Sequence, residues 1–325
     1  MIDGSAYMRK WLSTSMGAEG PSATRLASPH GRGAGLSIRT DRQARRGRLE
    51  LWRSDHAALR DDPLLQRLAG VTQVFSVSSN HSCATRLDHS LDVAEIAAVI
   101  AAELGLNVDL ASAIGLAHDC GHLPFGHAGE RELCRLVGSV NHADCGADLL
   151  HKRGYCPEIV SGVRSHSWSS STSCSTPEAE IVRWADRIAY LTRDFHDAVT
   201  LRLLSQTDLD SEVSNIIGDS LDVQRKSLIN GVVSASARTA RIAMEREEAA
   251  ALAAFRRANA ITIYQHPDVR QSNSNAQGII AETARILLNQ STGKQWDTVV
   301  AQLVSMTDAE AKLLALSAPV RRRPS

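Results

Sequence analysis

Apolar residues recur at helical spacing along most of the chain from about residue 58 onward. Between residues 88 and 105 they fall at i, i+3, i+4, i+7 and i+11, namely at Val93, Ile96, Ala97, Ile100 and Leu104. Such a stripe is typical of an amphipathic helix. The same criterion predicts further helices over residues 108–120, 127–137, 142–153, 225–264, 274–289 and 296–316, with a short one after Pro157 and another that begins at Pro177. Because the chain shows neither βαβ alternation nor an internal repeat, the predicted fold class is all-α.

Glycine, proline and capping residues predict where these helices end and begin. Gly121 and Pro124 end the helix over 108–120, because glycine is flexible and proline has no N–H to donate. Thr307 and Glu310 have the spacing of a capping box, which predicts that the last helical stretch restarts there. Residues 71–77 have the composition of a strand, so we expect at most a short hairpin near residues 71–84.

Charge is distributed unevenly along the chain. The formal net charge is zero, but residues 1–60 carry eleven Lys and Arg against five Asp and Glu. Residues 1–38 are rich in Gly, Ser, Ala and Arg, which predicts a disordered basic arm that is either a solvated tail or a contact for phosphates or single-stranded nucleic acid. We expect residues 39–205 to form the core and residues 206–325 to form a C-terminal helical part packed on it.

Length, cysteine usage and hydropathy exclude several classes of protein. A chain of 325 residues can bury a sizeable core without disulfide support. Its six cysteines include no CxxC pair, unlike a zinc ribbon or a secreted disulfide scaffold. No stretch approaches the roughly 20 apolar residues that span a bilayer, and the N-terminus lacks the apolar run of a signal peptide. We therefore expect a cytoplasmic protein with no membrane partner.

Histidines cluster in one part of the chain. Six of the twelve fall within 62 positions, at His81, His89, His118, His122, His127 and His142. The run HDCGHLPFGHAGE begins with the adjacent pair His118 and Asp119, which can direct a nitrogen and an oxygen at one cation. A mixed set of His and Asp ligands suits Mn²⁺, Fe²⁺ or Mg²⁺ better than a closed, Cys-rich zinc site does.

The helix that begins at Pro177 has two different faces. Its apolar stripe consists of Ile181, Trp184, Ile188, Leu191 and Phe195. The other side carries carboxylates and a phenol, at Asp186, Tyr190, Asp194 and Asp197. Residues four apart lie along one face of a helix, so one face is predicted to pack and the other to present polar groups to a ligand.

Several ordered segments resemble the HD superfamily and, within it, the deoxynucleoside triphosphate (dNTP) triphosphohydrolases of the dGTPase-like family. They are RLAGVTQVFS, TRLDHSLDVAEIA, AHDCGHLPFGHAGE, NHADCGADLL, ADRIAYLTRDFHDA and, near the C-terminus, VSMTDAEAKLL. The resemblance implies an HD-domain helical bundle with additional C-terminal helices. Arg193 stands where many relatives carry His, and a serine-rich loop replaces longer insertions, so base preference and any allosteric site stay open.

Residue roles follow from the resemblance. The implied ligands of a divalent metal ion, such as Mn, Mg or Fe, are His89, His118, Asp119 and Asp186. The implied catalytic group is His127 with its acidic partner Glu130, and His122 and His142 would line the triphosphate side. The implied substrate contacts are Gln73 for the sugar or base, Arg86 and Arg187 for the phosphates, and Tyr190 and Asp194 for the sugar.

The expected reaction is hydrolysis of a dNTP, with dGTP among the candidates, to the deoxynucleoside and inorganic triphosphate. One alternative is an HD-domain phosphohydrolase that acts on nucleoside monophosphates or guanosine polyphosphate alarmones. Another is a nucleotide-sensing, nucleic-acid-binding relative. We also expect a homo-oligomer.

Overall fold

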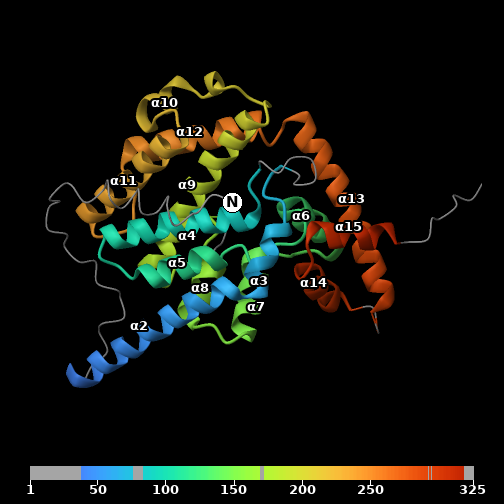
Figure 1. Cartoon of the computed structure of the whole chain (residues 1–325), viewed down its shortest axis with the longest axis horizontal. Coiled ribbons are helices and arrows are strands. Elements are labelled where there is room, and N and C mark those ends of the chain that lie inside the picture. The colour runs from blue at the N-terminus through green and yellow to red at the C-terminus, as the bar shows by residue number, and fades with distance from the viewer. Residues whose placement is uncertain (1–37, 76–82, 169–171, 292, 294, 318–325) are drawn as a thin grey trace, which may run out of the picture.

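The computed structural model describes residues 38–75, 83–168, 172–291, 293 and 295–317, and these form an assembly of helices (Figure 1). The α-helices are α2 (Ile38–Asp61), α3 (Pro63–Gln66), α4 (Arg86–Glu103), α5 (Val108–Ala117), α6 (Gly126–Val137), α7 (His142–Lys152), α8 (Pro157–Ser165), α9 (Pro177–Thr200), α10 (Ser211–Ile217), α11 (Leu221–Thr239), α12 (Arg246–Thr262), α13 (Pro267–Gln290), α14 (Trp296–Val304) and α15 (Asp308–Leu316). Two 3₁₀ helices, η1 (Arg67–Gly70) and η2 (Gln206–Asp208), complete the set. The all-α prediction is confirmed.

Local sequence explains how the helices that carry the site begin. The Thr85 hydroxyl accepts the backbone N–H of Asp88, and the Asp88 carboxylate accepts the backbone N–H of Thr85, which completes a capping box at the start of α4. Thr176 caps α9, whose first residue is a proline. The capping box predicted at Thr307 and Glu310 is present and begins α15.

Three sequence expectations differ from the structure. Residues 71–75 form no strand, only an isolated antiparallel bridge between Thr72 and Thr85, and residues 76 and 77 lie outside the described part of the chain. The single helix expected over 225–264 is two helices, because Ala240 adopts a left-handed backbone conformation with φ of 53° after α11 ends. The helix expected over 274–289 begins earlier, at Pro267.

Helix α2 was not expected, because its first half lacks an apolar stripe. In its second half Leu59 is buried and Trp52 lies against the core. In Figure 1 the N-terminal end of α2, drawn in blue, extends away from the other helices. The predicted arm over residues 1–38 falls almost entirely outside the described residues, and its disorder and nucleic-acid binding stay predictions.

Two hydrophobic cores hold the helices together. The larger one joins α4, α5, α8 and α9 with α10, α11 and α12. The smaller one joins Leu123 and α6 with the C-terminal helices α13, α14 and α15. The expected division at residue 205 stays a prediction, although residues on both sides of it share the larger core. None of the described helices meets the length and hydropathy needed to cross a membrane.

Candidate metal centre and active-site cleft

The loop between α5 and α6 brings the first chemical groups together. His118 caps the C-terminal end of α5, and Asp119 follows it directly. Gly121 is required in this loop, since a Cβ atom there would overlap the backbone at His142 and Gly146. The loop therefore passes directly against the start of α7, and this close approach places the ring of His142 beside the ring of His122.

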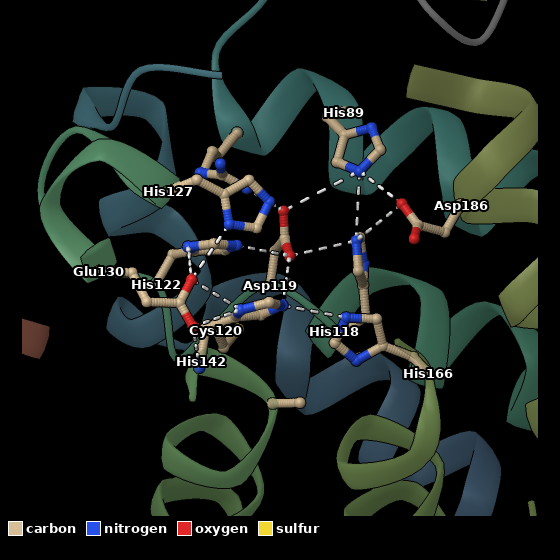
Figure 2. Close-up of polar contacts among 12 residues, drawn as sticks. His89, His118, Asp119, Cys120, His122, His127, Glu130, His142, His166 and Asp186 are labelled. Atoms are coloured by element: carbon tan, nitrogen blue, oxygen red, sulfur yellow. Dashed lines mark hydrogen bonds and ion pairs between the residues drawn. The ribbon is translucent and has the colours of Figure 1, made fainter. Parts of the chain in front are cut away.

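Four side chains from α4, the α5–α6 loop and α9 converge in a metal-ligand set (Figure 2). The Nε2 atoms of His89 and His118 are 3.2 Å apart. Asp186 Oδ1 lies 3.1 Å from His89 Nε2 and 3.8 Å from His118 Nε2. Asp119 Oδ1 lies 3.4 Å from His118 Nε2, and Asp119 Oδ2 lies 3.9 Å from His89 Nε2. Ligand atoms about 2.1 Å from one ion and at right angles to each other are about 3.0 Å apart. The ligand atoms of His89, His118 and Asp119 all lie within 4.8 Å of one another, so these three fit a single ion, and Asp186 Oδ1 lies beside both histidines.

Protonation in this set also favours a bound cation. His118 donates its Nδ1–H to the backbone oxygen of Gly115 at 2.7 Å, which leaves the lone pair on Nε2. That lone pair faces His89 Nε2, and without a cation the two nitrogen atoms would need a proton between them. Although burial opposes a charged ring, the hydrogen bond to Asp186 and the charge of Asp119 raise the pKa of His89. The groups around His89 Nε2 thus favour positive charge, which a metal ion at this point would supply.

Arg86, which was expected to contact phosphate, is almost completely buried and also contacts a metal ligand. Its side chain is 2% exposed and donates to Asp119 Oδ2. His118, His122 and Arg86 outweigh the loss of hydration and hold the pKa of Asp119 well below its usual range. A Cβ atom at Gly126 would overlap the Arg86 guanidinium, so a glycine is needed there. Arg86 also lines the cleft described below, so it can orient Asp119 and still face a ligand.

A second set of side chains surrounds Glu130. His127 Nδ1 lies 3.0 Å from Glu130 Oε2, and His142 Nδ1 lies 3.1 Å from the same oxygen. The backbone N–H of His142 donates to Glu130 Oε1 at 3.0 Å. Hydrogen bonds from the two rings outweigh the loss of hydration and lower the pKa of Glu130 strongly. One carboxylate therefore fixes the orientation of two imidazole rings.

His122 lies between the two sets and is fully buried. Its ring stacks on His142 with centroids 3.8 Å apart, and its Nε2 lies 3.3 Å from Asp119 Oδ1. Neither of its ring nitrogens makes a hydrogen bond of normal geometry within the described residues. Burial, Arg86 and His142 lower the pKa of His122 well below its usual value. His122 is a linking residue beneath the cleft rather than part of its lining.

The sequence prediction missed His166. It caps the C-terminal end of α8 and donates its Nδ1–H to the Val163 oxygen at 2.6 Å, as His118 does at the end of α5. Its Nε2 lies 3.3 Å from His142 Nε2, and burial lowers the pKa of His166 to about 3. The available signal was a histidine at a helix end, just before the serine-rich loop. Groups whose ligand atoms lie within 4.8 Å of one another are His89, His118 and Asp119; Asp119, His142 and His166; and His122, His127, Glu130 and His142.

Both sets lie beside one cleft of about 910 Å³. His89, Asp119 and Asp186 line it together with His127, whose side chain is 61% exposed. All the expected substrate contacts line it too, namely Gln73, Arg86, Arg187, Tyr190 and Asp194. Further arginines on its walls are Arg131, Arg256 and Arg270.

The polar face of α9 divides between the cleft and the rest of the fold. Tyr264 donates its hydroxyl to Asp194 Oδ2 at 2.7 Å, and burial raises the pKa of Asp194 to about 7. Asp197 does not line the cleft and accepts the backbone N–H of Ala84 at 3.0 Å instead. Arg193, the departure noted in the sequence, pairs with Asp92 at 2.9 Å and so lies away from the cleft.

The fold is all-α, and the site combines a buried set of His and Asp ligands with an arginine-lined cleft. These two features together define a class of protein. Comparison with known families matches residues 86–191 to the HD domain. Residues 86–191 thus match an HD domain, which confirms the resemblance to the HD superfamily read from the sequence.

Curated proteins that are similar to this chain carry a more specific name than the HD domain. The chain is 35% identical over 190 residues to the deoxyguanosinetriphosphate triphosphohydrolase-like protein of Caldanaerobacter subterraneus subsp. tengcongensis, a match that covers 56% of each chain. It is 34% identical over 181 residues to the protein of the same name from Clostridium tetani, covering 51% of this chain and 52% of the relative. The chain thus matches about half the length of these relatives.

Solved structures share the fold at lower identity. A phosphohydrolase from Bacteroides thetaiotaomicron aligns with a TM-score of 0.54 at 18% identity, covering 80% of this chain and 71% of the other. A hypothetical protein from Aquifex aeolicus aligns with a TM-score of 0.54 at 20% identity, covering 82% of this chain and 69% of the other. At these identities the likeness shows the fold alone.

Proposed function

We propose that the chain is a metal-dependent dNTP triphosphohydrolase, which converts a dNTP to the deoxynucleoside and inorganic triphosphate. The observation that carries the proposal is the composition of the cleft wall. Arg131, Arg256 and Arg270 line the cleft near the metal-ligand set, and within the described residues none of them has an ion-pair partner. Unpaired guanidinium groups around one cavity favour a ligand with several negative charges, such as a triphosphate.

The metal-ligand set fits a divalent ion in its donor atoms and in their spacing. Such an ion, when bound to His89, His118, Asp119 and Asp186, would polarise a phosphate oxygen and lower the pKa of water. The chain itself would hold the phosphates through the arginines, and Arg86 would keep Asp119 oriented. The names of the curated relatives agree with a nucleoside triphosphate substrate.

His127 is the residue proposed to move the proton. Its Nδ1 faces Glu130, which leaves Nε2 free for a group in the cleft. The side chain of His127 is 61% exposed, but its hydration within the cleft is restricted. This loss of hydration and the charge of Arg86 lower the pKa of His127, because together they outweigh the hydrogen bond to Glu130. In the reaction a water oxygen bonds to the α-phosphorus, the bond to the 5′ oxygen breaks, and that oxygen gains a proton.

Tyr190 and Asp194 are the residues proposed to contact the sugar. They follow Asp186 at intervals of four along α9 and line the same cleft. A nucleotide whose phosphates lie at the metal-ligand set would therefore extend along Tyr190. The ring beside the 2′ carbon would leave a ribose hydroxyl without space or a hydrogen-bond partner.

Product analysis tests the reaction directly. The purified protein is incubated with all dNTPs and NTPs in turn, with Mn²⁺, Mg²⁺ or Fe²⁺, in water enriched in ¹⁸O. We expect inorganic triphosphate that carries one ¹⁸O atom and an unlabelled deoxynucleoside. Release of orthophosphate or pyrophosphate instead would contradict the proposal and favour a monophosphate or alarmone substrate.

A further inference from the structure

The last described helix, α15, begins at the wall of the active-site cleft. Its first residue, Asp308, lies between two segments that are distant in sequence. Asp308 Oδ1 accepts the backbone N–H of Phe125 at 2.6 Å. Asp308 Oδ2 accepts the backbone N–H of Thr72 at 3.0 Å and the Thr72 hydroxyl at 2.5 Å. Both oxygens of one carboxylate are thus committed, each to a different segment.

These two segments carry groups that the proposed reaction uses. Phe125 precedes α6, the helix of His127 and Glu130, and Thr72 precedes Gln73, which lines the cleft. Phe125 adopts a left-handed backbone conformation with φ of 61°, which residues with a side chain rarely adopt. An acceptor that holds the Phe125 N–H therefore also holds an unfavourable turn in place.

A second set of contacts also holds the start of α15. Arg67 donates to the Met306 oxygen at 2.8 Å and to the oxygens of Cys120 and His122 at 3.2 and 2.9 Å. A Cβ atom at Gly70 would come within 2.7 Å of Thr307, so η1 packs closely against the residue that caps α15. The position of Asp308 is consequently determined by the same loop that carries Asp119 and His122.

We infer that Asp308 is a positioning residue for the proposed phosphohydrolase site. It couples the C-terminal helices to both Thr72, beside Gln73, and Phe125, at the start of the His127 helix. The inference rests on the proposed function for its effect on turnover, but its effect on the two segments does not depend on any substrate. Asp308 itself does not line the cleft and is not expected to touch the nucleotide or the metal ion.

The chemistry of the carboxylate makes the inference testable by a single substitution. Three donors converge on the two oxygens of Asp308, and a carboxylate offers acceptors on both. An asparagine offers one oxygen and one NH₂ group, and the NH₂ group would face an N–H donor. The Thr72 hydroxyl can turn to accept from this NH₂ group, but a backbone N–H cannot. Asp308→Asn therefore keeps the side-chain size and must release the backbone N–H of either Thr72 or Phe125.

The experiment compares Asp308→Asn with Asp297→Asn, a matched control at the exposed start of the neighbouring helix α14. Hydrogen–deuterium exchange is followed in peptides that cover residues 70–75 and 123–128. Metal content, kcat and KM are measured on whichever nucleotide the wild-type protein hydrolyses. We expect Asp308→Asn to speed exchange in at least one of the two peptides and to lower kcat at least tenfold while the metal content is retained. Asp297→Asn should stay within twofold of the wild type.

A second pair of variants distinguishes the loss of the Thr72 hydroxyl contact from a general loss of stability. Thr72→Ser keeps the hydroxyl that Asp308 accepts and Thr72→Val removes it, so the serine variant should retain several-fold more turnover. Unchanged exchange in both peptides of Asp308→Asn would overturn the inference, as would faster exchange with unchanged kcat. A loss of kcat that only follows a loss of metal or of folded protein would overturn it as well. If the wild-type protein releases no triphosphate, the proposed function fails, and the exchange measurement still decides the role of Asp308.

Discussion

The metal-ligand set and the second set, called here the Glu130 set (His127, Glu130 and His142), both combine histidines with carboxylates but are anchored differently. In the metal-ligand set, Nε2 atoms of two histidines face each other across 3.2 Å, and two carboxylates flank them. In the Glu130 set, Nδ1 atoms of two histidines face one carboxylate. The first arrangement concentrates lone pairs and negative charge, and the second already satisfies its carboxylate with hydrogen bonds.

Each arrangement therefore calls for a different partner. Among the described residues, Arg86 is the arginine that forms an ion pair with this set, through Asp119, and the lone pair of His118 Nε2 and the Asp186 carboxylate can still accept a divalent ion. Glu130 needs no further cation, because His127 and His142 both face it. The proposed metal site and the proposed proton-transfer site therefore differ in the direction of their ring nitrogens more than in their number of histidines.

The largest expected effect comes from removing a metal-ligand carboxylate. Asp186→Ala and Asp119→Ala should both lose bound metal and lower kcat/KM by roughly 10³-fold or more, since the ion supplies several kcal/mol of transition-state stabilisation. Only Asp119→Ala should also unfold more easily, because it leaves Arg86 buried without its carboxylate. Breaking a buried pair costs about 3–5 kcal/mol.

Elemental analysis and thermal unfolding of the two variants check this difference. Arg86→Met combined with Asp119→Ala should recover part of the lost stability without recovering metal. Equal unfolding temperatures for Asp119→Ala and Asp186→Ala would show that the Arg86 pair does not hold the fold together.

The next largest effect should come from His127, and it should show that the two sets have different roles. His127→Ala should lower kcat by about 10²–10⁴-fold, the usual range for a general acid or base, and should keep its metal. The matched control is His151→Ala, an exposed histidine on α7 that does not line the cleft. A His127→Ala protein with wild-type turnover, or one that has lost its metal, would contradict the division between the sets.

A smaller effect is expected at Asp194, a buried carboxylate that belongs to neither set. Burial raises its pKa to about 7 from the ordinary 3.8, so the folded state favours the protonated form. Its stabilising contribution is present below pH 4 and is lost as the pH rises from about 4 to about 7. Asp194→Asn should therefore stabilise the protein at pH 8 relative to the wild type, by up to about 4 kcal/mol, and much less at pH 4.

Unfolding temperatures of the wild type and Asp194→Asn at pH 4, 6 and 8 give the answer, with exposed Asp297→Asn as the control. A stabilisation that does not grow with pH would mean that Asp194 is ionised in the folded protein at neutral pH.

The sequence predicted helices α4 and α9, because their apolar residues recur at helical spacing. The resemblance to a known family, rather than periodicity, pointed to the four side chains that lie together in the metal-ligand set. The sequence did not predict α2, whose first half has no apolar stripe. It also missed His166 and the role of Asp308. Both depend on contacts over long sequence separations, such as the 236 residues between Thr72 and Asp308, which no local pattern records.

The smallest effect we expect is sugar selection by Tyr190, and it tests whether the cleft beyond the two sets reads the nucleotide. Tyr190 lines the cleft one helical turn after Asp186, and burial together with the charge of Asp186 raises its pKa to about 12, so the phenol is neutral. A ribose hydroxyl against the ring would be left unsatisfied, which costs about 1–3 kcal/mol. Since 1.4 kcal/mol is one factor of ten, dNTPs should be favoured over NTPs at least roughly tenfold in kcat/KM. Tyr190→Phe keeps the ring and should keep this ratio, whereas Tyr190→Ala should shrink it without loss of metal. Equal rates on dGTP and GTP in the wild type, measured with the other three pairs, would exclude Tyr190 as the sugar contact.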